Sequence, residues 1–146
     1  MCIRDSSKGL FENPLDMIKT KYLELQLTLD WLRHPLKRGD SVAVILHCTR
    51  IVQIVCQICY LLDRLCYPHD KWLFSYVSMT RFGKTNKQLI LKYAKNILDD
   101  RNVKKHLELN LYPQYERASF ITQKIGKFIR KHYGNQPWID KWYLFV

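Results

Sequence analysis

The sequence predicts an all-α fold, an up-and-down bundle of about four to six helices. The 146 residues contain only five glycines and five prolines, and most of these lie between stretches whose apolar residues recur at helical spacing. A composition of 47% hydrophobic and 25% charged residues is typical of globular proteins and excludes intrinsic disorder. The length fits one domain that can bury a core of its own.

The first six residues, Met1–Ser6, have neither the start pattern of a helix nor the apolar core of a signal peptide. This hexapeptide resembles the translation of the transposon end that is used to tag DNA libraries for sequencing. We therefore expect residues 1–6 to be translated adaptor and residues 7–146 to form a single helical domain. On this interpretation the natural sequence begins near Ser7 and is the C-terminal part of a longer protein.

The first predicted helix covers Leu15–Leu32, where apolar residues recur three or four positions apart. Asn13-Pro14 precedes this segment, and these residues suit an N-cap and a first-turn proline. The helix is expected to end at His34-Pro35, because proline cannot continue the hydrogen-bond pattern of a helix.

The longest apolar segment, residues 40–66, predicts the central helix of the bundle. Gly39 interrupts the helical pattern before this segment, and Asp40 or Ser41 is expected to be the N-cap of the central helix. Polar residues seven positions apart predict one polar line along this otherwise buried helix: Arg50, Gln57 and Arg64. Charged residues inside the segment also argue against a membrane span, because each charge at the bilayer centre costs about 3 kcal/mol or more.

The second half of the chain predicts further helices separated by short connections. Tyr67-Pro68 closes the central helix, residues 69–79 are expected to form a short helix or an ordered turn, and residues 81–86 are expected to be a loop. The predicted helices are residues 87–99, a segment capped by Asp100 or Asn102 that runs towards Leu111, and residues 115–133. The tail from Trp138 to Val146 is too apolar for a free end, so we expect either that it docks or that the chain was also cut here.

The net charge of +11 is large for a chain of this length, and it does not change if residues 1–6 are removed. Such a charge predicts an anionic partner, for which nucleic acid, a nucleotide, an acidic protein face and anionic lipid are the candidates. The alternative is a solvated basic surface without a specific partner.

Apart from Cys2, the chain has four cysteines: Cys48, Cys56, Cys59 and Cys66. No secretory segment precedes them, so a reducing cytoplasm is the expected location. The Cys56-x-x-Cys59 pair could indicate a redox or zinc site, but it lies inside the central helix and no second cysteine pair faces it. We therefore interpret these cysteines as small core residues and predict no metal site.

Two clusters of residues could bind an anion. In the first, Arg38 and the N-terminus of the central helix would lie beside a phosphate, although Gly39-Asp40 also fits ordinary helix capping. In the second, Lys71 and Trp72 follow a helix end, and a lysine beside aromatic faces suits a nucleotide. The alternative for the second cluster is an aromatic plug against the bundle.

A third cluster, Arg101 and His106, resembles the Arg-Asn-x-x-x-His motif of HEPN-type ribonucleases. An arginine and a histidine about one helical turn apart could hold and protonate a phosphodiester. The alternative is a basic, exposed start of a helix. No phosphate-binding glycine-rich loop, HExxH or Gly-x-Ser-x-Gly motif accompanies these clusters, so the sequence contains no complete active site.

The segment from Lys37 to Val77 resembles the helical C-terminal domain of aminoglycoside-adenylyltransferase-type nucleotidyltransferases, and more closely their DUF4037-type relatives. The residues that carry the resemblance are Arg38-Gly39-Asp40 and the set Tyr67, Pro68, Lys71 and Trp72. The similarity covers residues 15–77; beyond residue 80 it is only a similar helical length.

The resemblance implies a preceding α/β domain, absent from this sequence, that holds Mg²⁺ and a nucleoside triphosphate. The helical domain would form the substrate side of the cleft and assist transfer of a nucleoside monophosphate to an unidentified acceptor. Arg38 and Lys71 would then meet phosphate charge, Trp72 would wall the base or acceptor, and Asp40 would orient Arg38. Arg50 and Arg64 would be further residues of the cleft.

The charge of the chain argues against one substrate class of that family. Aminoglycosides are polycations, so a domain with a net charge of +11 is a poor host for them, and a nucleotide, an RNA end or an acidic protein is the better match. Two alternative functions stay open from the sequence. One is a HEPN-type ribonuclease that pairs two motifs in a dimer, and the other is a non-catalytic basic module that binds RNA or nucleotides.

Overall fold

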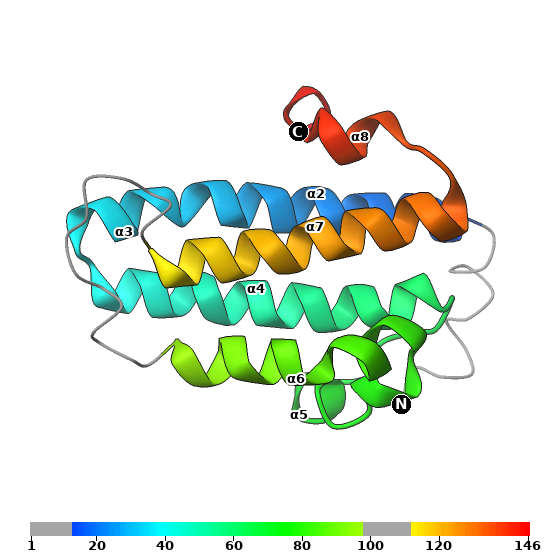
Figure 1. The fold of residues 1–146 in the computed structure, drawn as a ribbon, viewed down its shortest axis with the longest axis horizontal. Coiled ribbons are helices and arrows are strands. Elements are labelled where there is room, and N and C mark those ends of the chain that lie inside the picture. The colour runs from blue at the N-terminus through cyan, green and yellow to red at the C-terminus, as the bar shows by residue number, and fades with distance from the viewer. Residues whose placement is uncertain (1–12, 98–111) are drawn as a thin grey trace.

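The computed structural model describes residues 13–97 and 112–146, and it confirms an all-α bundle without a strand in these two ranges. Four long helices run side by side with alternating direction, which gives the predicted up-and-down arrangement (Figure 1). They are α2 (Pro14–Trp31), α4 (Ser41–Leu62), α6 (Arg81–Asn96) and α7 (Pro113–Tyr133). The segment predicted to run from Asp100 or Asn102 towards Leu111 lies outside the described residues.

A short helix, α3 (Arg33–Arg38), follows α2 where the sequence predicted only a helix end. Pro35 has no N–H, so it cannot donate to the carbonyl of Trp31 four residues earlier, and α2 ends there. The chain then turns at Gly39, which has a φ of 70°. The N–H of Asp40 donates to the carbonyl of Pro35 at 3.0 Å and closes the end of α3.

The central helix α4 begins as predicted, because the Asp40 carboxylate accepts a hydrogen bond from the N–H of Ala43 at 3.0 Å. It ends at Leu62, four residues earlier than predicted, in a turn around Arg64. The predicted polar line is wrong, since Gln57 is only 6% exposed and Arg64 lies beyond the end of the helix.

The predicted loop over residues 81–86 is also wrong, because α6 begins at Arg81. After α5 (Asp70–Leu73) and the 3-10 helix η1 (Val77–Met79), Thr80 caps α6 by accepting from the N–H of Gly83 at 3.0 Å. Gly83 lies in the first turn of α6, pressed against η1, and a Cβ atom there would be 2.0 Å from the carbonyl oxygen of Val77. The glycine therefore allows close packing and does not mark a break in the helix.

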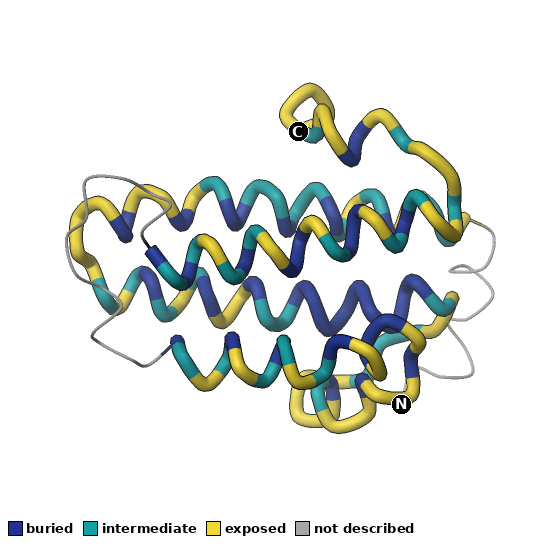
Figure 2. Tube along the Cα trace, in the orientation of Figure 1, coloured by how far each residue is buried: buried dark blue, intermediate teal, exposed yellow. Residues whose placement is uncertain are grey.

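The core is centred on α4, which is buried along much of its length between α2, α6 and α7 (Figure 2). Beyond Gly134 the chain forms α8 (Pro137–Asp140) and a final 3-10 helix, η4 (Trp142–Leu144). Trp138 is buried, and its ring centroid lies 5.5 Å from that of Tyr22 in α2. The expected docking of the tail is confirmed for α8, whereas residues 143–146 are exposed.

One helix in the described ranges, α4, is long and apolar enough to cross a membrane, with a mean hydropathy of 1.8 over its most apolar window. Half of that window is buried inside the bundle. A core helix meets the same two criteria of length and composition, so the fold shows no clear membrane span.

Candidate functional site

Arg38 and Asp40 lie at the joint between α3 and α4, and their contacts are those of a helix cap. One Asp40 oxygen accepts from the N–H of Ala43, and the other lies 3.4 Å from Arg38. The hydrogen bond from Ala43, and to a smaller extent Arg38, hold the pKa of Asp40 below its usual value. The pair is exposed, and the predicted orientation of Arg38 by Asp40 fits this geometry.

Lys71 and Trp72 lie on α5 and are exposed to solvent. The Lys71 Nζ lies 5.5 Å from the centre of the Trp72 ring, so the predicted lysine–aromatic pair is formed. The next two residues, Leu73 and Phe74, pack against the core instead. Leu73 and Phe74 therefore pack as the plug interpretation predicts, and Lys71 and Trp72 face outwards. Nucleotide binding by Lys71 and Trp72 stays a prediction.

Arg50 is linked to the α5 segment through Gln53, which also contacts Asp70, whereas Arg64 lies elsewhere. Arg50 forms an ion pair with Glu24 of α2 and a hydrogen bond with Gln53, so its guanidinium ties two helices together. Arg64 is exposed just beyond the end of α4 and has a φ of 59°.

The six predicted site residues do not form one site. Asp40 and Asp63 mark the two ends of α4, and at a rise of about 1.5 Å per residue they are about 35 Å apart. Gln53, whose side chain donates a hydrogen bond to Asp70 of α5, lies about 20 Å along α4 from Asp40. A single nucleotide cannot span the predicted set. The alternative catalytic pair, Arg101 and His106, lies outside the described residues.

The structure instead indicates a candidate basic surface on α6 and α7, which the sequence motifs did not predict. Together these two neighbouring helices carry ten lysines and arginines and one acidic residue, Glu116. In α2 and α4, by contrast, three basic and three acidic residues cancel. The basic residues are Arg81, Lys84, Lys87, Lys92, Lys95, Arg117, Lys124, Lys127, Arg130 and Lys131.

A groove of about 240 Å³ runs between these helices, and we call it the α6–α7 groove. Lys124, Lys127 and Lys131 recur at positions i, i+3 and i+7 of α7 and therefore share one face of the helix. No carboxylate pairs with them among the described residues. The groove is lined by Arg81, Phe82, Thr85, Asn86, Lys124, Lys127, Phe128 and Lys131.

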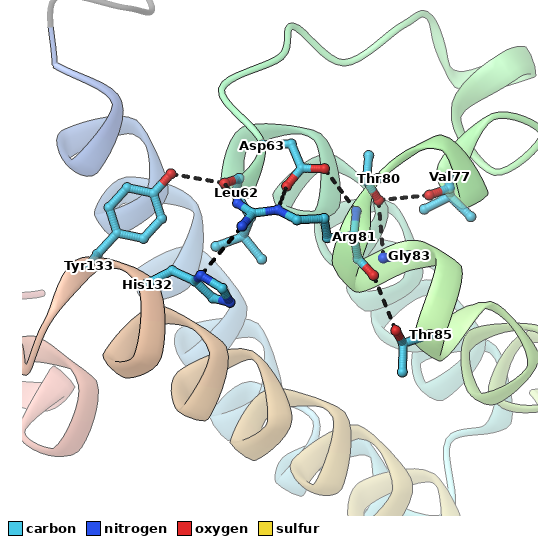
Figure 3. Close-up of polar contacts among 9 residues, drawn as sticks. All are labelled: Leu62, Asp63, Val77, Thr80, Arg81, Gly83, Thr85, His132 and Tyr133. Carbon is cyan, nitrogen blue, oxygen red and sulfur yellow. Dashed lines mark hydrogen bonds and ion pairs between the residues drawn. The ribbon is translucent and has the colours of Figure 1, made fainter.

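Arg81 lines both this groove and a second, polar pocket of about 240 Å³ at the end of the bundle. Figure 3 shows the polar contacts of Arg81. Its backbone N–H and its Nε each donate to Asp63 at 2.8 Å, and its Nη1 lies 3.4 Å from the Nδ1 of His132. The Tyr133 hydroxyl donates to the carbonyl of Leu62 at 2.8 Å beside it. The guanidinium is thus held in place before any ligand binds.

The described cysteines do not form a reactive site. Burial raises the pKa of the Cys48 thiol to about 11 and that of Cys56 to about 12, and it also raises the pKa of Cys59 well above its usual value. None of the four forms a disulfide, and the described residues contain no group of three side chains suited to a metal ion. These findings agree with the interpretation of the Cys56-x-x-Cys59 pair as core.

Comparison of the chain with protein-family models, curated proteins and solved structures finds no significant match. The resemblance to nucleotidyltransferase helical domains therefore stays a prediction from Arg38-Gly39-Asp40 and the Tyr67–Trp72 segment. Among the described residues, the α6–α7 groove is the candidate site that the geometry supports best.

Proposed function

We propose that this helical domain binds nucleic acid through the phosphates, with the α6–α7 groove as its contact surface. The observation that carries the proposal is the segregation of charge: two adjacent helices hold ten cationic side chains against one carboxylate. Neutralising phosphates with lysine and arginine releases bound counterions, which is the main source of sequence-independent affinity for nucleic acid.

The dimensions of the groove fit this role. Lys124 and Lys131 are seven residues apart, which is about 10 Å along the axis of α7. Consecutive phosphates of one strand advance by about 3.4 Å along a duplex axis, so the row of lysines can follow about three of them. Arg81, already held by Asp63, would add a further contact at one end of the row.

Charge reversal tests the proposal with the full chain and a fluorescent 20-nucleotide RNA, measured by polarisation. The groove variant combines Lys124→Glu, Lys127→Glu and Lys131→Glu. The control combines Arg33→Glu, Lys37→Glu and Lys141→Glu, which changes the net charge equally at exposed sites outside α6 and α7. We expect the groove variant to lose about tenfold or more in affinity, and much more than the control. Equal losses in both variants, or no binding by the parent, would contradict the proposal.

The second candidate is the substrate-side helical domain of a nucleotidyltransferase, with Mg²⁺ and a nucleoside triphosphate held by a preceding domain. The observation that favours it is the fixed position of α5, where Lys71 and Trp72 face outwards while the Tyr60 hydroxyl donates to the Leu73 carbonyl at 2.7 Å. In the protein reassembled with that preceding domain, we expect Lys71→Ala to weaken ATP binding without lowering the melting temperature, and Lys37→Ala to leave ATP binding unchanged. Equal ATP affinity in both variants would count against this function.

The ribonuclease alternative with Arg101 and His106 stays a prediction, tested by RNA cleavage that is lost in His106→Ala. A cytoplasmic location also belongs to this proposal. It is supported by four cysteines without a disulfide among the described residues, which is the usual state of thiols in a reducing compartment.

A further inference from the structure

A cavity of about 620 Å³ opens between α4, α5 and the C-terminal half of α6. Its volume falls in the range of pockets that hold a small molecule or a single nucleotide base. Three polar residues, Thr49, Gln53 and Asp70, line one side. The Thr49 hydroxyl already donates to a carbonyl of its own helix at 2.7 Å. Most of the remaining wall is apolar: Ile45, Val52, Leu73, Phe74 and Ile97.

The Asp70 carboxylate is held at the cavity by Gln53. The Gln53 Nε2 lies 2.9 Å from both Asp70 oxygens, and the Gln53 Oε1 in turn accepts from Arg50. A carboxylate has about four acceptor positions, and one amide group sharing its hydrogens between the two oxygens leaves acceptor capacity on both. Asp70 is exposed at the cavity and can therefore accept two adjacent donors of a ligand.

Three cationic residues are linked to this cavity by the chain or by a contact. Lys71 follows Asp70 in the chain, and the Nζ of Lys87 lies 5.6 Å from the centre of the Phe74 ring in the cavity wall. Arg50 lies at the other end of the Gln53 bridge. A ligand suited to this setting combines a neutral, flat, apolar body with two hydrogen-bond donors for Asp70 and an anionic group for the lysines.

We propose that the cavity binds a guanine base, with Asp70 accepting from its N1–H and 2-amino groups and Lys71 or Lys87 meeting the phosphate. Among the four RNA bases, guanine presents two adjacent donors on its Watson–Crick edge. Unstacked bases of single-stranded RNA are read in this way, by contacts to that edge and by packing against aromatic or apolar side chains such as Phe74. The inference rests on the proposed nucleic-acid function and gives it a base preference.

The test compares GMP with IMP, which differs only by lacking the 2-amino group, by titration calorimetry with the full chain. Loss of one hydrogen bond to a carboxylate lowers affinity by about tenfold or more, so GMP should bind at least that much more tightly than IMP. Asp70→Asn should remove the difference. Asp30→Asn, an equal change of charge on a carboxylate paired with Arg33, should retain it.

A third variant fills the cavity. Ala94→Trp places a large side chain in its wall and should abolish binding of both nucleotides while circular dichroism confirms a folded bundle. Equal binding of GMP and IMP, a preference that survives Asp70→Asn, or no binding of either nucleotide would overturn the inference. Polyuridylate, which lacks guanine, separates this failure from failure of the α6–α7 groove: its salt-sensitive binding tests the proposed function alone.

Discussion

At the residue scale, Arg64 stands out because it adopts a left-handed backbone conformation that usually belongs to glycine. The N–H of Arg64 donates to the Leu61 carbonyl and the N–H of Leu65 to the Tyr60 carbonyl, both at 2.9 Å. These are the two hydrogen bonds of a Schellman motif, which closes α4 at the cost of a Cβ in a strained position.

Replacing this residue tests the strain directly. We expect Arg64→Gly to be more stable than Arg64→Ala by about 1 kcal/mol, because both variants remove the same side chain contacts and only glycine relieves the left-handed strain. The measurement is the free energy of unfolding from urea titrations of both variants. Equal stability of the two would show that the turn is not strained at this position.

The buried thiols lead to a second prediction at the same scale. Burial raises the pKa of Cys48 to about 11 and that of Cys56 to about 12, and it also raises the pKa of Cys59, so these three cysteines carry almost no thiolate at pH 8. We expect these three cysteines to resist iodoacetamide in the native protein and to react once guanidinium unfolds it, as measured by mass spectrometry of peptides. Rapid native labelling of Cys56 and Cys59 would instead indicate an accessible redox pair.

At the element scale, the junction of η1 and α6 depends on the absence of a side chain at Gly83. A methyl group there would meet the backbone carbonyl of Val77, which cannot move aside without displacing η1. Gly126 in α7 offers a matched control, because its methyl group would approach only the side chains of Ile139 and Tyr22, at 3.1 and 3.3 Å.

We therefore expect Gly83→Ala to destabilise the protein by about 1–3 kcal/mol despite the better helix propensity of alanine. Gly126→Ala should cost less, because flexible side chains can adjust and the propensity gain of about 1 kcal/mol offsets the crowding. Thermal unfolding of both variants is the measurement. If Gly83→Ala proves the milder change, the close approach of η1 does not determine stability.

The same elements show what the sequence could predict and where it failed. The apolar spacing identified α2, α4 and α7. Asp40 could be predicted as an N-cap because the cap involves only residues that are close to it in the chain. Gly83 was misread as a loop residue because glycine has two roles, breaking a helix and allowing close approach, and only the position of η1 distinguishes them. Gln57 could not be assigned, since its burial depends on neighbours distant in sequence.

At the scale of the whole molecule, the net charge was visible in the composition but its location was not. A net charge of +11 identifies neither the face that carries the charge nor the partner that binds it. The short motifs pointed to Arg38 and Lys71 instead. The spacing of Lys124, Lys127 and Lys131 could have indicated a basic face on α7. Only the packing of α6 against α7 shows that Arg81 lines the same groove as these three lysines.

This concentration of charge predicts a definite salt dependence. If Arg81 and the three lysines each contact one phosphate of single-stranded RNA, the logarithm of the association constant should fall with the logarithm of salt concentration at a slope of about −3. Polarisation titrations at salt concentrations from about 50 to about 200 mM measure this slope. A slope near zero would exclude a phosphate-binding groove.

The contact between α8 and α2 has a consequence for how the protein is made. The Tyr22 hydroxyl donates to the carbonyl of Ile139, 117 residues later in the chain, at 3.3 Å, and Trp138 packs on the same tyrosine. During synthesis this contact cannot form until residues 137–139 have left the ribosome. The four long helices precede these residues in the chain, so α8 is the last of the described helices that can dock on α2.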